Sequence, residues 1–370
     1  MAHAPTPVGR SEMVRMKWIY RFDELGKEHN DIVGKKCANL GEMTRAGFRV
    51  PPGFALTLEA YDRFMKETGA IEEIRQYLAT FSADPDNPAD MPKYGKASEV
   101  IRDIVESKEM PKDMEDVIRQ YYDGLCQMTG TSDLPVATRS AGPASHPGQY
   151  ETYLYIRDGA EVVKNIIKVW SSTFNQRSII ARARLGLPLE YDPIGVAVLK
   201  MVNAKAAGVM FTLNPVTGDP SKIVIDGNWG LGESVVSGSV TPDEWMVDKV
   251  ILEITKVTVS PKLKEYVLDT KTGRTMFVDT PPERQNAPCL SREEVLELAR
   301  IGKKVEDHYG IAQDTEWAID NDLPFPESIF MLQCRPEQVW SQKKKEPVLG
   351  KKSGYELLME RALKSTKVKL

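Results

Sequence analysis

The sequence predicts an α+β fold in which a mostly helical half precedes a half built largely from antiparallel strands. Residues 58–129 carry apolar side chains at helical spacing, in several pieces separated by polar or proline-containing turns. From residue 194 onward the pattern changes to short apolar runs bounded by turn residues, which is typical of strands. Because helices followed by strands are characteristic of α+β proteins, this order favours α+β over a doubly wound parallel sheet.

The composition argues against several classes of protein. The chain has 370 residues, enough for two or more subdomains, and its 41% hydrophobic and 28% charged residues are typical of globular proteins. A net charge of −4 argues against a nucleic-acid-binding surface, and we find no apolar run of membrane-spanning length and no signal peptide. The four cysteines form no CxxC pair, which argues against a zinc site or a disulfide framework. We therefore expect a cytoplasmic protein that binds neither nucleic acid nor a membrane.

Lys36 is the first candidate for a ligand contact. A strand is expected at residues 18–22, and the next segment is a loop that runs into a helix ending near Gly47. Lys36 lies where this loop meets the helix, and helix amides together with a lysine favour an anion there. The alternative is a solvated lysine on a first helical turn. A further strand leads to Thr57, which we expect to cap the helix that follows.

Arg139 ends a short strand predicted at residues 134–140. The small residues 141–149 form a flexible, amide-rich loop, and such a loop beside an arginine can close over phosphates. A plain surface loop is the alternative. His146 in this loop is a candidate catalytic residue, although a histidine in such a position is more often simply solvated.

The rest of the chain repeats the same two patterns. One long helix is expected at residues 161–184 and another at residues 291–307, where Ser291 and Glu294 form a capping box. The glycine-containing segment 226–238 matches neither a Walker A loop nor a Rossmann loop, so alone it is a weak signal. The strands expected in this half lie at residues 194–202, 207–213, 223–226 and 245–247.

The segment from Asp314 to Arg335 predicts a hairpin with a long loop. Side chains alternate along a strand, so Asp314 and Glu316 share one face of the first strand. Apolar residues on both faces of the second strand indicate that it is covered on both sides. The same alternation gives one face of the second strand four residues, which are Ile329, Met331, Gln333 and Arg335.

The polar residues of this hairpin suit a metal ion that carries a polyphosphate. They need partners, because an unpaired buried charge is costly. Glu316 and Gln333 offer the oxygen ligands that magnesium accepts, and Arg335 can hold a phosphate through two hydrogen bonds. The alternative is a structural ion pair between Glu316 and Arg335.

Several short motifs occur in a fixed order over about residues 16–340, and together they are more specific than any one of them. They resemble the nucleotide-binding domain of phosphoenolpyruvate synthase, a domain shared with pyruvate phosphate dikinase and rifampicin phosphotransferase. The motifs are Val33–Met43, Arg139–Ser140, Gly148–Thr152, Gly208–Thr212, Gly230–Glu233, Pro242–Asp243, Asp314–Trp317 and Leu332–Glu337.

The resemblance implies an ATP-grasp fold, in which two α+β subdomains clamp ATP together with Mg²⁺. It also assigns roles to residues in three groups. The implied catalytic and phosphate-binding residues are Lys36, Arg139 and Arg335, the nucleotide-loop residues are Gly148 and Thr152, and the metal site comprises Glu316, Gln333 and Asp314, with Gln333 also contacting the nucleotide.

Three features depart from the family pattern. The loop after Arg139 is shorter and lacks an acidic segment, which bears on how it closes over the nucleotide. Lys35 replaces a glycine, and Leu199 stands where relatives often have a glutamine that faces the nucleotide. We therefore expect the glutamine contact to be lost.

The resemblance also implies an organisation of the chain and of its partners. We expect a leader at 1–15, subdomains at 16–190 and 191–340, and a basic linker with a docking helix at 341–370. Related enzymes carry a swivelling domain with a phosphorylated histidine, and the chain stops where that domain would begin. None of the four histidines, His3, His29, His146 and His308, lies in the corresponding setting.

The sequence therefore predicts one subunit of a split dikinase. It would use Mg-ATP to phosphorylate a histidine on a partner subunit, with release of AMP and phosphate, and a third subunit is compatible with this arrangement. Phenylphosphate synthase, which phosphorylates phenol, is the specific expectation, with a phosphoenolpyruvate synthase-like reaction beside it. The alternatives are a carboxylate–amine ligase with the same fold and a nucleotide-sensing module without catalysis.

Overall fold

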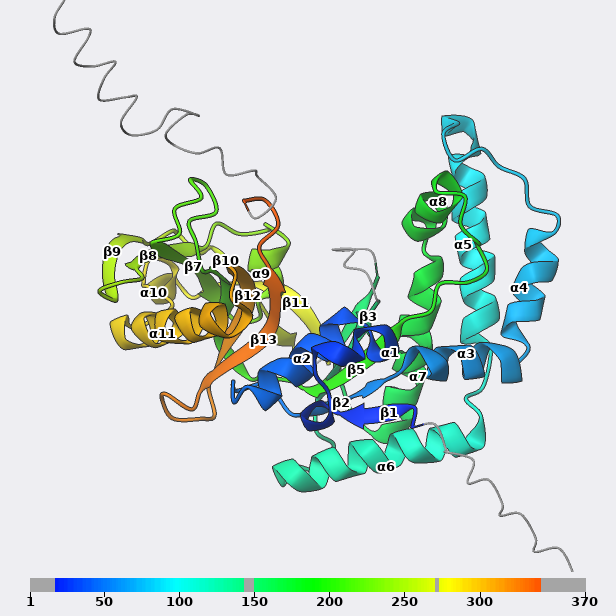
Figure 1. The fold of residues 1–370 in the computed structure, drawn as a ribbon, viewed down its shortest axis with the longest axis horizontal. Helices are drawn as coiled ribbons and strands as arrows, with labels where there is room; N and C mark the ends of the chain where they lie inside the picture. Colours follow the sequence, from blue (N-terminus) through cyan, green and yellow to red (C-terminus); the bar gives the residue numbers. More distant parts are fainter. Residues whose placement is uncertain (1–16, 143–149, 270–272, 341–370) are drawn as a thin grey trace, which may run out of the picture.

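The computed structural model describes residues 17–142, 150–269 and 273–340. The predicted leader at 1–15, the loop residues His146 and Gly148, and the predicted linker at 341–370 lie outside the described residues. Two sheets organise the rest, and each is covered by its own helices (Figure 1). The protein is therefore α+β, as the order of helices and strands predicts.

The first sheet has five antiparallel strands in the order β1-β2-β5-β3-β4. Placing residues 194–202 with the second sheet was wrong, because β5 pairs with β2 on one side and β3 on the other. The division of the chain into domains at residue 190 stays a prediction. The strands are β1 (Ile19–Arg21), β2 (Gly53–Leu56), β3 (Val136–Ala141), β4 (Thr152–Ile156) and β5 (Gly195–Lys200).

Helices pack around this sheet because each has one apolar face. Thr57 caps α3 as predicted, since its side chain accepts a hydrogen bond from the Ala60 amide. Trp170 of α7 is fully buried and lies 5.1 Å from the ring of Phe64, so it joins α3 to α7. The helices are α1 (Asn30–Val33), α2 (Lys35–Arg45), α3 (Leu58–Glu67), α4 (Ala70–Leu78), α5 (Met91–Glu106), α6 (Lys112–Thr129), α7 (Gly159–Ser171) and α8 (Gln176–Arg184).

The single helix expected at residues 161–184 is two helices in the structure. Helix α7 ends at Ser171, and a 3-10 turn at Ser172–Phe174 follows it. Asn175 then caps α8 by accepting a hydrogen bond from the Ser178 amide. The prediction failed because an apolar stripe gives the period of a helix but does not reveal a side chain that starts a new one.

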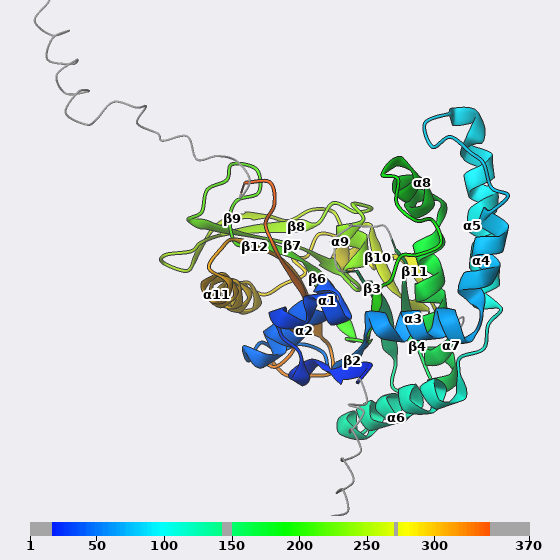
Figure 2. The same cartoon turned by 45° about the vertical axis from the view of Figure 1, so that its right-hand side comes forward.

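The second sheet has six antiparallel strands in the order β13-β12-β6-β7-β8-β9. Helix α11 packs on one side of it, against β7, β8 and β12 (Figure 2). Strands β10 and β11 form a separate two-stranded sheet. Most residues of β9 and β11 are exposed, so no buried face marked these strands in the sequence. The elements are β6 (Ala204–Phe211), β7 (Lys222–Trp229), α9 (Glu233–Val236), β8 (Asp243–Asp248), β9 (Glu253–Thr258), β10 (Lys264–Asp269), β11 (Arg274–Asp279), α10 (Pro282–Gln285), α11 (Arg292–Tyr309), β12 (Gln313–Asp320) and β13 (Ile329–Pro336).

A bulge in β13 changes which of its residues share a face. Glu316 pairs with Gln333, whereas the next residue, Trp317, pairs with Met331, so Leu332 is an extra residue. Met331 therefore points into the core with Trp317, and the prediction that it shares a face with Gln333 was wrong. A bulge reverses the alternation of side chains, and here it directs the polar end of β13 away from the core.

Asp243, from the Pro242–Asp243 motif, holds the second half together. Its carboxylate accepts hydrogen bonds from Lys262 Nζ at 2.7 Å and from the amides of Ser260 at 2.9 Å and Cys289 at 2.8 Å. Asp243 and Lys262 are both fully buried, so each charge is compensated by the other. Among the helices that the structure describes, none is both long enough and apolar enough to traverse a lipid bilayer.

Candidate functional site

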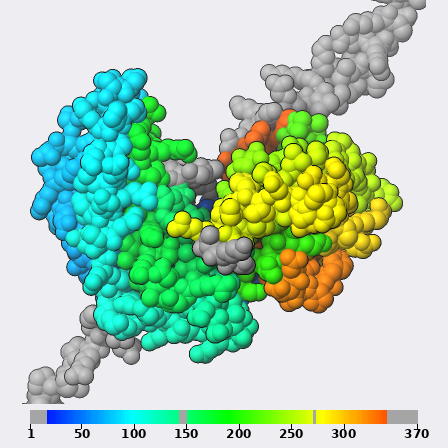
Figure 3. Space-filling model, turned by 180° about the vertical axis from the view of Figure 1, so that it is seen from behind, coloured from blue at the N-terminus to red at the C-terminus, as the bar shows by residue number. Residues whose placement is uncertain are grey.

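A cleft of about 1170 Å³ separates the two halves of the protein. Its walls come from the start of α2, from β3 and β4, from the end of β5 and the linker at residues 201–202, and from the second sheet. Figure 3 shows the notch between the halves from behind. Lys36, Arg139, Thr152, Glu316, Gln333 and Arg335 all line the cleft, although they come from both halves of the sequence.

Arg139 joins the two halves at the centre of the cleft. It lies on β3, and its guanidinium donates to the Glu316 carboxylate at 3.2 Å and to the Gln333 side-chain oxygen at 3.3 Å. A third hydrogen bond, of 3.4 Å, reaches the Leu332 carbonyl at the bulge. The ion pair of Arg139 with Glu316 is mostly shielded from solvent, with 17% and 22% of the side chains exposed.

Glu316 and Gln333 stand opposite each other on β12 and β13. One oxygen from each accepts a hydrogen bond from the same nitrogen of Arg139, so the two oxygens converge on one point. These donors suit magnesium, which binds a few protein oxygens and takes its remaining ligands from water and phosphate. Within residues 17–142, 150–269 and 273–340, no cluster of three or more His, Cys, Asp or Glu residues could hold a metal.

Arg335 is held by Asp314 and not by Glu316. Its Nε and Nη2 donate to the same Asp314 oxygen at 2.8 Å and 2.6 Å. The alternative of a structural pair between Glu316 and Arg335 was therefore wrong, because each has a different partner. Burial raises the pKa of Asp314 and Arg335 opposes the rise. Asp314 is not among the residues lining the cleft, so it orients Arg335, and its predicted place at the metal stays a prediction.

Lys36 reaches the cleft because α2 begins against the end of β3. Gly34 precedes the helix with a φ of +80°, and a Cβ on it would lie 1.8 Å from the Ala141 carbonyl oxygen. The Lys35 amide then donates to the Gly142 carbonyl at 2.9 Å. Lys36 Nζ has no hydrogen bond or ion pair with the described residues, and the lysine lies near two arginines. Lys36 is only partly exposed to solvent and forms no ion pair with the described residues, so its charge favours the binding of an anion there.

Burial lowers the pKa of Lys36 to about 8, with Arg139 and Arg335 adding to the decrease and Glu316 opposing it. An anion that binds beside Lys36 favours the charged form and raises this pKa, so binding at about pH 8.5 takes up a proton. We expect calorimetry of Mg-ATP binding in buffers of different ionisation enthalpy to show this uptake. Lys36→Met should abolish it, and an equal uptake in that variant would contradict the assignment.

The lowered pKa of Lys36 also makes the free energy of unfolding of the free protein depend on pH. The folded value of about 8 lies below the usual value of 10.5, so the unfolded chain binds more protons between these limits. The charged lysine therefore opposes folding at neutral pH, and the free energy of unfolding gains a favourable contribution as the pH rises from 8 to 10.5. Lys36→Met should lack this gain.

Two further predicted positions lie in the described part of the cleft. Thr152 pairs with Arg139 across β3 and β4, which places it beside the cations. Leu199 lines the cleft with 3% of its surface exposed. Leu199 offers no polar group there. The loss of the nucleotide contact that a glutamine would make stays a prediction.

Reasoning from the sequence gave no role to several residues that line the cleft. Glu233 begins α9, and burial raises the pKa of its carboxyl, with Glu316 adding to the rise and Arg139 opposing it. Its place in the Gly230–Glu233 motif was the available signal. Tyr155 and Met201 carried no signal, because Tyr155 lies within a strand of ordinary composition and Met201 follows an apolar run.

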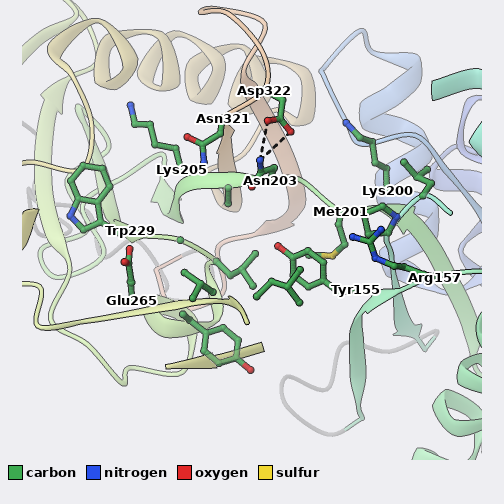
Figure 4. Close-up of a pocket in the computed structure, with 18 of the residues that line it drawn as sticks. Tyr155, Arg157, Lys200, Met201, Asn203, Lys205, Trp229, Glu265, Asn321 and Asp322 are labelled. Atoms are coloured by element: carbon green, nitrogen blue, oxygen red, sulfur yellow. Dashed lines mark hydrogen bonds between the residues drawn. The ribbon is translucent and has the colours of Figure 1, made fainter. Parts of the chain in front are cut away.

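A second cavity of about 790 Å³ adjoins the cleft (Figure 4). It contains the cations Arg157 and Arg284, and the latter lies over the Trp229 ring at 4.3 Å and pairs with Glu265 at 3.0 Å. Its boundary with the cleft is formed by residues that line both, namely Tyr155, Lys200, Met201, Ala204, Leu231 and Tyr266.

Comparison with known proteins relates this architecture to one family. Residues 30–354 match the family described as "Pyruvate phosphate dikinase, AMP/ATP-binding domain". The chain is 38% identical to a probable phosphoenolpyruvate synthase of Staphylothermus marinus, over 91% of this chain and 43% of that protein. It is 41% identical to the probable enzyme of Methanothermobacter thermautotrophicus, over 87% and 46%. It is 40% identical to the phosphoenolpyruvate synthase of Aeropyrum pernix, over 89% and 43%. The chain thus spans less than half the length of these relatives.

Proposed function

Since the chain belongs to the AMP/ATP-binding domain family of pyruvate phosphate dikinase, we propose that it binds Mg-ATP between its halves and phosphorylates a histidine elsewhere. The two halves clamp the nucleotide in the manner of an ATP-grasp fold. The observation that carries the proposal is the convergence of Lys36, Arg139 and Arg335 on one cleft beside Glu316. Six lysine and arginine residues and two glutamates line the cleft, so positive charge is left for a polyphosphate to neutralise.

The residues of the cleft have different roles in phosphoryl transfer, a reaction that depends mainly on positioning the phosphates and stabilising their charge. Glu316 and Gln333 would hold a magnesium ion, which would neutralise phosphate charge. With these two oxygens on a metal, Arg139 would be free to donate its hydrogen bonds to the phosphates. Arg335 is fixed by Asp314 and presents its remaining donors, and Lys36 adds a charge from the first turn of α2.

The acceptor histidine comes from outside the described residues in this proposal. The described part of the chain has two histidines, His29 and His308, and neither lines the cleft. His29 accepts a hydrogen bond from the Gly26 amide, and His308 lies 2.7 Å from Glu42. We place the acceptor on a swivelling domain of a partner subunit, with AMP and phosphate as products; a third subunit is compatible.

The final acceptor defines the overall reaction. The sequence resemblance points to phenol, as in phenylphosphate synthase, and the names of the relatives point to a phosphoenolpyruvate synthase-like reaction. A carboxylate–amine ligase with the same fold would form ADP. A nucleotide sensor, which the apolar Leu199 favours, would bind ATP without turnover.

The test follows ATP labelled at the β-phosphate. The purified chain alone should take up no stable label, and a histidine-bearing protein that co-purifies with it should become labelled as AMP forms. Formation of ADP in place of AMP would favour the ligase. Stoichiometric labelling of the isolated chain that His146→Ala abolishes would overturn the external acceptor.

A further inference from the structure

Tyr155 has a backbone conformation that its side chain disfavours. Its φ is +57°, in the left-handed region where the Cβ of an L-residue approaches the following carbonyl. Among the described residues the non-glycine residues with positive φ are Asp133, Tyr155, Asp158 and Leu252. The two aspartates are of a type that tolerates this region, whereas a bulky aromatic residue there is an outlier.

The conformation arises from a bulge in β4. The pairing of β3 with β4 shifts between Val136 and Thr138, so Ala137 faces two residues, Leu154 and Tyr155. A bulge with a residue in the left-handed conformation usually has glycine at that position, since glycine has no Cβ. The path of the backbone therefore does not explain why a tyrosine occupies this position.

Contacts within the described part of the protein do not explain the tyrosine either. The neighbouring side chains of Tyr153, Leu154 and Ile156 pack against the hydrophobic cores, but Tyr155 does not. Its hydroxyl has no hydrogen bond with the described residues, and its ring pairs with no other described aromatic ring. A strained residue without internal partners is more often found where a ligand binds.

The ring of Tyr155 lies at the boundary between the cleft and the second cavity. Met201 of the linker, Leu231 that follows β7, and Tyr266 of β10 line both cavities with it. Figure 4 shows Tyr155 and Met201 both reaching into the second cavity. These four side chains come from both halves and from the linker between them, and together they make an apolar slot.

The slot is set back from the phosphate end of the cleft. Thr152 of β4 pairs with Arg139, which marks the phosphate end, and Tyr155 is three residues farther along the same strand. Three residues of an extended strand span about 10 Å, and the bulge makes the span from Thr152 to Tyr155 somewhat shorter. The slot therefore lies at the distance from the cations where the nucleoside part of a bound nucleotide would be.

We propose that Tyr155 is the residue that holds the nucleotide base, by stacking its ring on the face of a purine. The inference rests on the proposed function and adds the base contact to it. Aromatic rings stack on bases largely irrespective of the hydrogen-bonding groups of the base. Tyr155 thus compensates for the lack of a polar side chain at Leu199. The backbone strain keeps the ring in the cleft instead of in either core.

Calorimetry with two ligands separates the base contact from the phosphate contact. Tyr155→Asn removes the ring and places a residue that tolerates the left-handed region, and Tyr155→Phe is the matched control that keeps the ring. We expect Tyr155→Asn to weaken Mg-ATP at least about fivefold. Its affinity for magnesium tripolyphosphate, which has no base, should stay unchanged, and Tyr155→Phe should bind both ligands like the wild type.

Thermal unfolding of the free protein tests the structural alternative. If the ring served the fold, Tyr155→Asn would lower the melting temperature and leave the ratio of the two affinities unchanged, which would overturn the proposal. We expect a melting temperature equal to or above that of the wild type, since the substitution relieves strain. Equal loss of both ligands in Tyr155→Asn would also overturn it. Failure of the wild type to bind either ligand would instead defeat the proposed function.

Discussion

Arg139→Lys is expected to lower phosphoryl transfer about 100-fold while the protein stays folded. Arg139 lies at the centre of the cleft, and its guanidinium donates hydrogen bonds to Glu316, Gln333 and the Leu332 carbonyl. Each hydrogen bond to a charged phosphate contributes about 1.5–3 kcal/mol. A lysine keeps the positive charge but lacks the planar guanidinium group. It therefore cannot donate to two phosphate oxygens and at the same time contact the second sheet.

The measurement is the single-turnover rate of label transfer to the histidine-bearing protein. Arg75→Lys is the matched control, because the Arg75 side chain lies on the exposed face of α4 and pairs with Glu72 at 2.8 Å on the surface. Transfer at the wild-type rate in Arg139→Lys would show that the planar guanidinium group is not used. A variant that unfolds would show that Arg139 serves mainly to join the halves.

Glu316→Gln is expected to remove the dependence of ATP binding on magnesium. The carboxylate is the one formal negative charge held directly against Arg139 in the cleft, and it stands opposite Gln333. Without it, a divalent ion loses its charged protein ligand, whereas metal-free ATP loses a repulsive neighbour. The variant should therefore bind metal-free ATP at least as tightly as the wild type, gain nothing from added magnesium, and transfer no phosphate.

Calorimetry with and without magnesium measures this effect. Glu244→Gln is the control, because a cross-strand row that begins at Glu316 continues through Val209 and Asp226 to Glu244. Glu244 thus lies on the same face of the sheet but outside the cleft, where it pairs with Lys256 at 2.9 Å. An unchanged magnesium effect in Glu316→Gln would move the metal to other ligands.

The fold class and the main residues that line the cleft could be predicted from the sequence, because both depend on local patterns. Helical and strand periods marked most of the elements. The ordered motifs then indicated that Lys36, Arg139 and the β12–β13 hairpin face one ligand, and the structure brings them into one cleft. The start of α2 is local too, since Gly34 and the turn after it decide where Lys36 points.

What the sequence did not reveal depends on pairing between distant segments. The bulge at Leu332 decides that Gln333 faces the cleft while Met331 enters the core, and a bulge leaves no trace in an alternating pattern. Strand β5 looked like the first strand of the second half but completes the first sheet. Arg335 pairs with Asp314 because the β12–β13 register sets them opposite each other, and that register follows from the bulge.

A crystal structure with magnesium and a non-hydrolysable ATP analogue tests the proposed arrangement of the nucleotide. We expect phosphate oxygens within hydrogen-bonding distance of Lys36, Arg139 and Arg335, with the metal on Glu316. The base should lie against Tyr155. Phosphates bound instead in the second cavity, at Arg157 and Arg284, would show that Lys36, Arg139 and Arg335 do not form the phosphate site.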